Sequence, residues 1–582
     1  MFEQYYEEEL RYLYESGCEF ARAHPERAQY LNIDSVGDRD PYVERLFEGF
    51  AFLTARIRQR LEDSFPQLTE GLVNLLWPQY LQEIPSLSIV QLTPRTGLLN
   101  GSRILPARSE IISDPAGNDG VRCKFTTVHP VAVHPLVLGS VERNINNQNN
   151  EILTFTFLFN KTVDWSNFDL KSIRLFLHAE LPVALKVHRA LTAMVKDAEI
   201  EFGDSGQVYR IDPVKAVTPG GFTAEESVLP QTRAGFTGYS LLREYFVYPE
   251  KFLFIDLNGI DTLPSPQTTP EKLTYRITIR EPLPLDKSIT PSMFKLNCCP
   301  AANLFRKTLE PITKTGMKSE YRVVADSSYS SSVHAHSIIK VIGTDNITGN
   351  RSVYEPLYTF ANIGSDIPKT YATRFCRSSD GKREMDMLLS GSEIVDGQIR
   401  EENLVIEAWC TNGKVPREYL REKQISSPGP GFPDSFSVTN ITRPTPPCLP
   451  PAAEDLLWKF QAHMAANQTS LASKDALKQF LQLYNWSPLE GRARKIEAIT
   501  EVKSGPVDAL YSGSVLRGVK FTVTIEEPPF DDTGDLHLFG LVLSQFLSQY
   551  VAINSFCELE FILKPSDKRM SWNNVEGKQC LI

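Results

Sequence analysis

Apolar residues at helical spacing dominate the start of the chain. They recur with spacings of 4, 4, 3, 4 and 3 residues and predict a helix over 2–23 that ends before His24-Pro25: Phe2, Tyr6, Leu10, Leu13, Gly17 and Phe20. Tyr5 and Tyr12 add a second aromatic face. The helix thus has more apolar surface than one packing partner would bury. Two interpretations stay open, namely two-sided packing within the domain or a bundle helix that needs partner chains.

The next residues predict two further helices. Asp40 as N-cap and Pro41 at the first helical position favour a second helix. Its apolar positions predict a wide buried face: Val43, Leu46, Phe47, Phe50, Leu53, Thr54, Ile57 and Leu61. A third helix is expected over 66–76, before Trp77-Pro78. The arginines at 56, 58 and 60 suit the end of the second helix, and neighbouring Glu62 and Asp63 argue against a phosphate site.

From Ser86 onward the apolar period changes toward two residues. Leu153, Phe155, Phe157 and Phe159 alternate with polar positions, which predicts a half-buried strand. Further strands are expected at 252–257, 273–279, 320–325, 337–342 and 403–410, with a short helix over 182–195. We therefore expect at least two β-domains between residues 85 and 425.

The last third of the chain begins with a proline-rich stretch and then mixes helices with strands. Eight prolines between 426 and 451 exclude a helix or a central strand, so this stretch is a stiff linker or an extended strap. Helices are expected over 473–484 and 539–550, and strands over 519–525 and 557–563. The predicted class is multidomain α+β, with a helical segment (1–84), β-rich domains (85–285 and 286–425), the linker or strap (426–451) and an α+β domain (452–582).

Composition and charge narrow the class of partner. The 582 residues include 61 basic and 71 acidic side chains, which gives a net charge of −10 and argues against nucleic acid or anionic lipid as a partner. The acidic start around Glu7 does not resemble a signal peptide, and no apolar run is long enough to span a membrane. Nine cysteines without a C-x-x-C pair are typical of a reduced, cytoplasmic chain.

Three local patterns carry possible chemistry, and each has a simpler interpretation. Asp532-Thr533-Gly534 matches the aspartic protease triplet, but that reaction needs a second such carboxylate. His334 and His336 share one face of a predicted strand but lack a third metal ligand at motif spacing. Cys298-Cys299 is interpreted as core packing, and His129 and His134 give no stronger signal. We predict no catalytic, metal or cofactor residue; the alternatives are a hydrolase or a carbohydrate-binding β-protein.

Several long blocks together resemble one family, the TssF (VasA/ImpG) subunits of type VI secretion baseplates. The resemblance rests on FEQYYEEELRYLYESGCEFARAHPERAQYL from residue 2, on VGDRDPYVERLFEGFAFLTARIRQRLEDSF from residue 36, on YSLLREYFVYPEKFLFIDL and on LNCCPAANLFRKTLEPI. Near the end, LYSGSVLRGVKFTVTIEEPPF and LFGLVLSQFLSQYVAINSFCELEF complete it. The matching blocks span nearly the whole chain, in order.

The resemblance implies a structural, non-enzymatic role in a contractile injection machine. The implied partners are TssG, a second TssF copy, TssK, TssE, the VgrG hub and neighbouring wedges, at a baseplate docked on the cytoplasmic face of the inner membrane. N-terminal helices are then expected to form a bundle with TssG, and the C-terminal part to contact another wedge. The predicted interface residues are Tyr5, Tyr6, Leu10, Tyr12, Leu13, Phe20, Phe47, Phe50, Phe546 and Tyr550.

Overall fold

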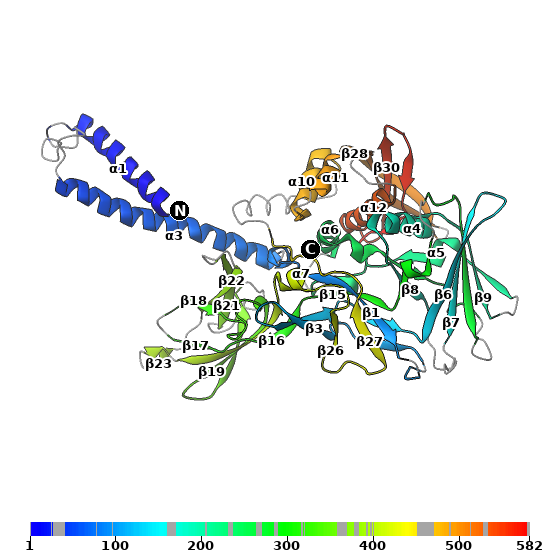
Figure 1. Cartoon of the computed structure of the whole chain (residues 1–582). Helices are drawn as coiled ribbons and strands as arrows, with labels where there is room; N and C mark the ends of the chain where they lie inside the picture. The colour runs from blue at the N-terminus through cyan, green and yellow to red at the C-terminus, as the bar shows by residue number, and fades with distance from the viewer. Residues whose placement is uncertain are drawn as a thin grey trace. The chain divides into compact units, whose positions relative to one another are not determined.

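A computed structural model of the chain shows many helices and sheets and confirms the multidomain α+β class (Figure 1). It describes residues 2–24, 26, 41–76, 78–95, 97–99, 101–159, 170–203, 207–230, 237–263, 270–284, 289–315, 318, 320–357, 369–377, 383–390, 394–395, 398–399, 401–450, 471–487, 490–511, 514–527 and 533–578. The chain divides into two compact units, one of residues 1–76 and 452–460, the other of residues 77–451 and 461–582.

The first unit contains a helical hairpin. Helix α1 spans Phe2–Ala23, as the apolar spacing predicts, and helix α3 spans Pro41–Leu76. The prediction of two helices over 41–76 was wrong, because α3 continues through Pro66. A proline removes one backbone hydrogen bond, and a helix of 36 residues keeps the bonds on either side of it.

Three sheets of the second unit are formed by strands that lie between residues 87 and 440. A six-stranded sheet has the order β26 (Ile425–Pro428), β3 (Glu110–Ala116), β4 (Val121–Thr127), β15 (Cys298–Ala302), β1 (Leu87–Pro94) and β27 (Phe436–Asn440). A five-stranded sheet has the order β10 (Val208–Ile211), β9 (Val195–Phe202), β13 (Lys272–Ile279), β7 (Glu151–Phe159) and β6 (Leu136–Ile145). A four-stranded sheet has the order β11 (Val217–Pro219), β12 (Phe254–Leu257), β8 (Ile173–Leu177) and β14 (Phe294–Leu296).

The second unit also contains a larger, eight-stranded sheet and two separate pairs of strands. Its path is β16 (Phe305–Thr308), β25 (Glu402–Thr411), β19 (His334–Asp345), β20 (Arg351–Pro356), β21 (Thr370–Arg377), β22 (Arg383–Ser390) and β18 (Glu320–Val323), while β17 (Ile312–Lys314) also pairs with β25. The small pairs are β2 (Arg103–Leu105) with β5 (Val131–Val133) and β23 (Ile394–Val395) with β24 (Gln398–Ile399). The helices of this part are α4 (Leu181–Ala193), α5 (Pro213–Ala216), α6 (Thr237–Val247) and α7 (Val415–Tyr419).

The six-stranded sheet joins segments that the sequence analysis assigned to three different parts. Strand β15 lies between β4 and β1, so the predicted division at 285/286 runs through a shared sheet. One apolar core extends from this sheet into the larger one, from Val90 to Val438, and includes Phe125, Cys299 and Ile406. Strand pairing between distant segments leaves no local mark in the apolar pattern, so the sequence alone did not indicate this shared sheet.

The proline-rich stretch is an extended strap over β1, and its two strands occupy the edges of the six-stranded sheet. Beyond β27, Thr442 Oγ1 accepts the amide of Ile89 at 2.8 Å, and Thr445 Oγ1 accepts the amide of Leu87 at 2.9 Å. Ser88 Oγ donates in return to the carbonyl of Thr442 at 2.7 Å. The amides of Ile441 and Thr445 donate to the carbonyls of Ile89 and Leu87 at 2.9 Å, so backbone bonds and threonine hydroxyls together satisfy the polar groups of this side of β1.

The C-terminal part is α+β, as expected. Its described elements are α10 (Lys474–Tyr484), α11 (Glu490–Glu497), β28 (Ile499–Tyr511), β29 (Ser514–Glu526), α12 (Thr533–Leu547), β30 (Phe556–Lys564), β31 (Arg569–Ser571) and β32 (Val575–Glu576). Strands β29 and β30 are parallel, and α12 connects them. Helix α12 also packs on α4 and α6, so it is buried on nearly every side rather than amphipathic.

Candidate interaction surface

The two helices of the hairpin run antiparallel and are held together by two groups of contacts. In the first, Arg58 of α3 forms ion pairs with Glu8 at 3.3 Å and Glu9 at 3.0 Å of α1. In the second, the Tyr14 hydroxyl donates to Glu44 at 3.4 Å, and the Tyr14 ring meets Phe47 edge to face at 5.9 Å. These polar and aromatic contacts set the alignment of the helices.

The fully buried side chains in the first part of α3 are small ones. Ala51 and Ala55 lie one helical turn apart, and both are fully buried. The prediction of a wide buried face was therefore wrong for the large residues Leu46, Phe50 and Leu53. Alanines on the inner face of a helix let two backbones approach closely, and the large apolar side chains then face away.

The outward apolar residues of α3 form a continuous stripe. Leu46, Phe50, Leu53 and Ile57 follow spacings of 4, 3 and 4 residues, and each is between 56% and 60% exposed. At 100° per residue these side chains lie within about 60° of arc on one face of the helix. We call these four residues the α3 stripe. A sustained 4-3-4 apolar pattern is typical of a helix that packs against another helix.

The interface residues expected from the sequence divide between half-buried and exposed positions of the hairpin. Tyr5, Tyr6, Leu10, Leu13 and Phe47 are half-buried, whereas Tyr12 and Phe20 of α1 and Phe50 of α3 are exposed. Sequence reasoning assigned Leu46, Leu53 and Ile57 to an internal core and therefore did not name them. Their heptad-like spacing was a usable signal, but spacing does not tell an internal face from an external one.

Two expected interface residues lie in the chain's own core. Phe546 of α12 is fully buried and packs on Phe480 of α10, with ring centroids 5.2 Å apart. Tyr550 is also buried, and its hydroxyl forms a 2.8 Å hydrogen bond with the hydroxyl of Tyr239. Internal packing already covers both side chains, so neither residue is available for the partner contact that the sequence predicted.

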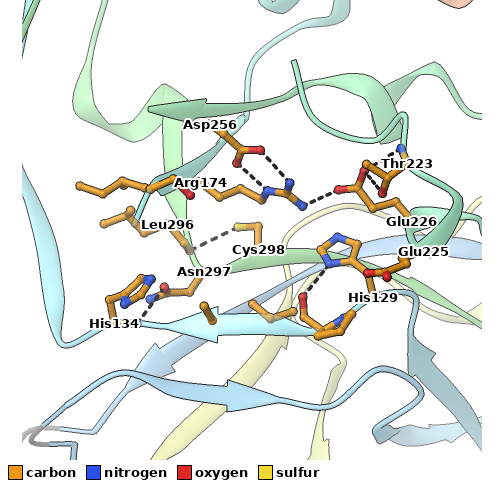
Figure 2. A pocket seen from close by; sticks show the side chains of 15 residues that line it. His129, His134, Arg174, Thr223, Glu225, Glu226, Asp256, Leu296, Asn297 and Cys298 are labelled. Carbon is orange, nitrogen blue, oxygen red and sulfur yellow. Dashed lines mark hydrogen bonds and ion pairs between the residues drawn. The ribbon is translucent and has the colours of Figure 1, made fainter. Parts of the chain in front are cut away.

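A second candidate site is a polar pocket of about 350 Å³ in the second unit, shown in Figure 2. Arg174 of β8 lies at its centre and donates to both carboxylate oxygens of Asp256, at 2.7 and 2.8 Å, and to Glu226 at 2.5 Å. Glu226 also accepts the amides of Gly221 and Thr223. Burial opposes the charge of Glu226, but Arg174 and these donors lower its pKa to about 2. The pocket is thus lined by an ion network whose members already satisfy one another.

The pocket also brings together histidines and a cysteine that the sequence analysis treated separately. His129, His134 and Cys298 all line it (Figure 2), whereas Cys299 belongs to the apolar core. Burial opposes the ionisation of Cys299, yet the neighbouring His129 lowers its pKa. Burial raises the pKa of Cys298 well above its ordinary value. The cysteine with the favourable pKa is enclosed and the one lining the pocket is not activated, which is a poor arrangement for nucleophilic catalysis.

The remaining candidate patterns also have structural explanations. His336 is buried in β19 and forms a 2.9 Å hydrogen bond with the carbonyl of Glu83. Throughout the described part of the chain, no three His, Cys, Asp or Glu side chains are grouped as metal ligands would be. Asp532 lies outside the described residues, and Thr533 and Gly534 begin α12, where a Cβ on Gly534 would contact the backbone of Leu185 at 2.6 Å.

No helix in the described ranges is both long and apolar enough to cross a membrane. Taken together, the fold and the hairpin define a multidomain α+β protein that presents a helical apolar surface. The chain belongs to the TssF family: the family model described as "Type VI secretion system, TssF" matches residues 1–579.

Known proteins are similar to this chain over almost its whole length. The type VI secretion system component TssF1 of Pseudomonas aeruginosa is 26% identical over 621 aligned residues, which cover 99% of this chain and 98% of the relative. A chain of a TssK-TssF-TssG baseplate subcomplex is 32% identical, with a TM-score of 0.78 over 91% of this chain and 98% of that one. A chain of a type VI baseplate complex is 30% identical, with a TM-score of 0.63 and full coverage of both.

Proposed function

We propose that the chain is a non-enzymatic structural subunit of a type VI secretion baseplate, in which it assembles with TssG and TssK. Membership of the TssF family and the likeness to a chain of a TssK-TssF-TssG subcomplex support this assignment. We further propose that a second copy, TssE, the VgrG hub and neighbouring wedges complete its contacts, at the cytoplasmic face of the inner membrane. In this proposal the chain functions by binding several partner subunits rather than by catalysis.

The α3 stripe is the single observation that carries the proposal. Four large apolar side chains on one face of α3 remain exposed in the folded chain. Full burial of such a side chain contributes about 1.5–3 kcal/mol because apolar surface leaves water, and covering the remaining 56–60% of each one contributes roughly half of that. We propose that TssG supplies this helix, with Tyr12 and Phe20 of α1 near the edge of the same contact. The half-buried residues Tyr6, Leu10 and Leu13 then support the hairpin from within.

The decisive experiment is co-expression with the TssG of the same system, followed by mass measurement of the purified complex. The variant Leu46→Asp/Leu53→Asp changes only exposed positions, so the chain is expected to fold and to lose TssG. The expected wild-type complex contains two copies of this chain for each TssG. A Leu10→Asp/Leu13→Asp variant is less informative, because those positions are half-buried in the hairpin.

The matched control places aspartate at exposed apolar positions of the second unit. Ile347 and Ile553 are both largely exposed, and the Ile347→Asp/Ile553→Asp variant is expected to keep TssG. If the stripe variant copurifies with TssG in the wild-type amount, the proposed bundle contact is wrong. If both double variants lose TssG, general destabilisation explains the result and the stripe has no special role.

A further inference from the structure

Three arginines come together where helix α7 meets the strap. Arg417 lies in α7, Arg421 follows the end of that helix, and Arg443 belongs to the strap after β27. Arg443 Nη2 donates to the carbonyl of Arg417 at 3.0 Å, and Arg417 Nη1 donates to the carbonyl of Pro444 at 3.2 Å. The two segments therefore hold each other through their arginines. We call Arg417, Arg421 and Arg443 the arginine patch.

A fully buried asparagine fixes the backbone beneath this patch. Asn440 Nδ2 donates to the carbonyls of Arg421 at 3.0 Å and Thr442 at 2.9 Å, and its Oδ1 accepts the amide of Ile425 at 2.8 Å. A single side chain thus ties the turn after α7 to the strap. Because the backbone is held in this way, the fold itself determines that the three arginines lie near one another.

The positive charges of the patch are not neutralised within the described part of the chain. None of the three guanidinium groups forms an ion pair with a described carboxylate, Glu418 and Glu422 of the same segment included. Local desolvation, and then the like charges of Arg417 and Arg421, lower the pKa of Arg443. The chain has more acidic than basic residues, so carboxylates that could pair with these arginines are plentiful. Because the three arginines nevertheless repel one another without a described counter-charge, we infer that an anion from another molecule neutralises them.

We propose that the arginine patch docks an acidic segment of a protein partner. Guanidinium groups bind carboxylates through two parallel hydrogen bonds, which makes an arginine cluster selective for carboxylate-rich segments. A net charge of −10 disfavours the approach of nucleic acid or an anionic membrane, which are large polyanions. A short acidic segment interacts mainly with the charges near the patch, because salt screens the more distant ones. The proposal rests on the assembly function proposed above, and it adds a polar contact far in sequence from the hairpin.

Titration of the full chain with a fluorescein-labelled hexaglutamate peptide at low ionic strength tests the patch. Arg421→Glu is the informative variant, because its side chain has no described hydrogen bond to lose. We expect it to weaken binding about tenfold, since charge reversal turns attraction into repulsion. The control, Arg351→Glu, reverses an exposed arginine of β20 and is expected to bind like the wild type. Equal binding by both variants, or tighter binding of a single-stranded oligonucleotide than of the peptide, would overturn the proposal.

Cross-linking in the assembled complex tests the same patch with its physiological partner. Lys414 and Lys423 are exposed beside the patch, and a carbodiimide joins lysine amines directly to carboxylates. We expect links from these two lysines to Asp or Glu of another subunit, and their loss in Arg421→Glu. A complex that forms normally but shows no such links, or shows them unchanged in the variant, would contradict the patch alone. Failure of any complex to form would instead contradict the proposed baseplate function.

Discussion

Helices α3 and α12 show opposite uses of an apolar surface. Helix α3 buries Ala51 and Ala55 and exposes large apolar side chains, whereas α12 buries nearly every residue, among them the polar Asp535, His537 and Ser544. Helices α4 and α6 and strand β30 cover α12, while α1 packs along α3. An apolar stripe therefore indicates that a helix packs against other elements. The rest of the fold determines whether those elements belong to the same chain.

The largest expected effect compares the same substitution on the two helices. Phe546→Ala removes a fully buried ring of α12 and is expected to cost about 3–5 kcal/mol of stability, because it leaves a cavity. Phe50→Ala removes an exposed ring of α3 and should change stability by less than about 0.5 kcal/mol while weakening TssG capture. Thermal unfolding and copurification of both variants measure this difference. Equal destabilisation by the two changes would show that the stripe is covered within the chain.

The next prediction concerns acid sensitivity at the contact between α4 and α12. His188 is fully buried without a described hydrogen bond to either ring nitrogen, and burial lowers its pKa to about 4. Burial, together with the nearby charges of His188 and Arg189, lowers the pKa of His537 as well. As the pH falls, these histidines become protonated in the unfolded chain at a higher pH than in the folded chain. The free energy of unfolding is therefore unaffected by them above about pH 6.5 and decreases as the pH drops toward 4.

For His188 alone, the free energy of unfolding decreases by about 3 kcal/mol at the acid end of this range. The measurement is the unfolding temperature from about pH 7 to about pH 5. His188→Leu should reduce its slope against pH, and Phe50→Ala should keep the wild-type slope. An unchanged slope in His188→Leu would exclude this histidine as the origin of the acid sensitivity.

A smaller effect is expected for the buried Asp535 of α12 than for the residues above, and none for Asp532, which lies outside the described residues. Asp535 is buried and forms a 2.5 Å ion pair with Lys495, whose side chain is 17% exposed. Asp535→Asn is therefore expected to cost about 1–3 kcal/mol, since it leaves Lys495 without its counter-charge. Asp532→Asn is expected to leave stability, assembly and secretion unchanged. Loss of secretion with assembly intact in Asp532→Asn would support the hydrolase alternative instead.

The smallest expected effect lies in the hairpin itself. Arg58→Ala removes the ion pairs with Glu8 and Glu9, and the Arg58 side chain is 43% exposed. Such exposed pairs contribute less than about 1 kcal/mol, because water screens them. The variant should unfold at nearly the wild-type temperature and retain TssG. A loss of TssG here would mean that helix alignment, rather than the apolar stripe alone, controls capture.

Local signals in the sequence predicted many elements closely. The bounds of α1 match the prediction because a proline follows its last turn, and α10 starts after Ser473, whose hydroxyl accepts the amide of Ala476. The alternation of β13 reproduces its burial pattern residue by residue. Prolines excluded central strands from the strap, and its strands indeed lie at sheet edges. Each of these features depends on residues that are close in sequence.

Features that depend on distant segments were not predicted. The pocket joins His129, Arg174 and Cys298, which are far apart in sequence, and β15 inserts between β4 and β1. The arginine patch required Asn440 to bind two backbones at once. The sequence by itself determined how acidic the chain is and where many helices and strands form, although not that α3 continues through Pro66. Only the tertiary structure decided which apolar faces are covered, because burial depends on which distant elements pack together and no local pattern records that choice.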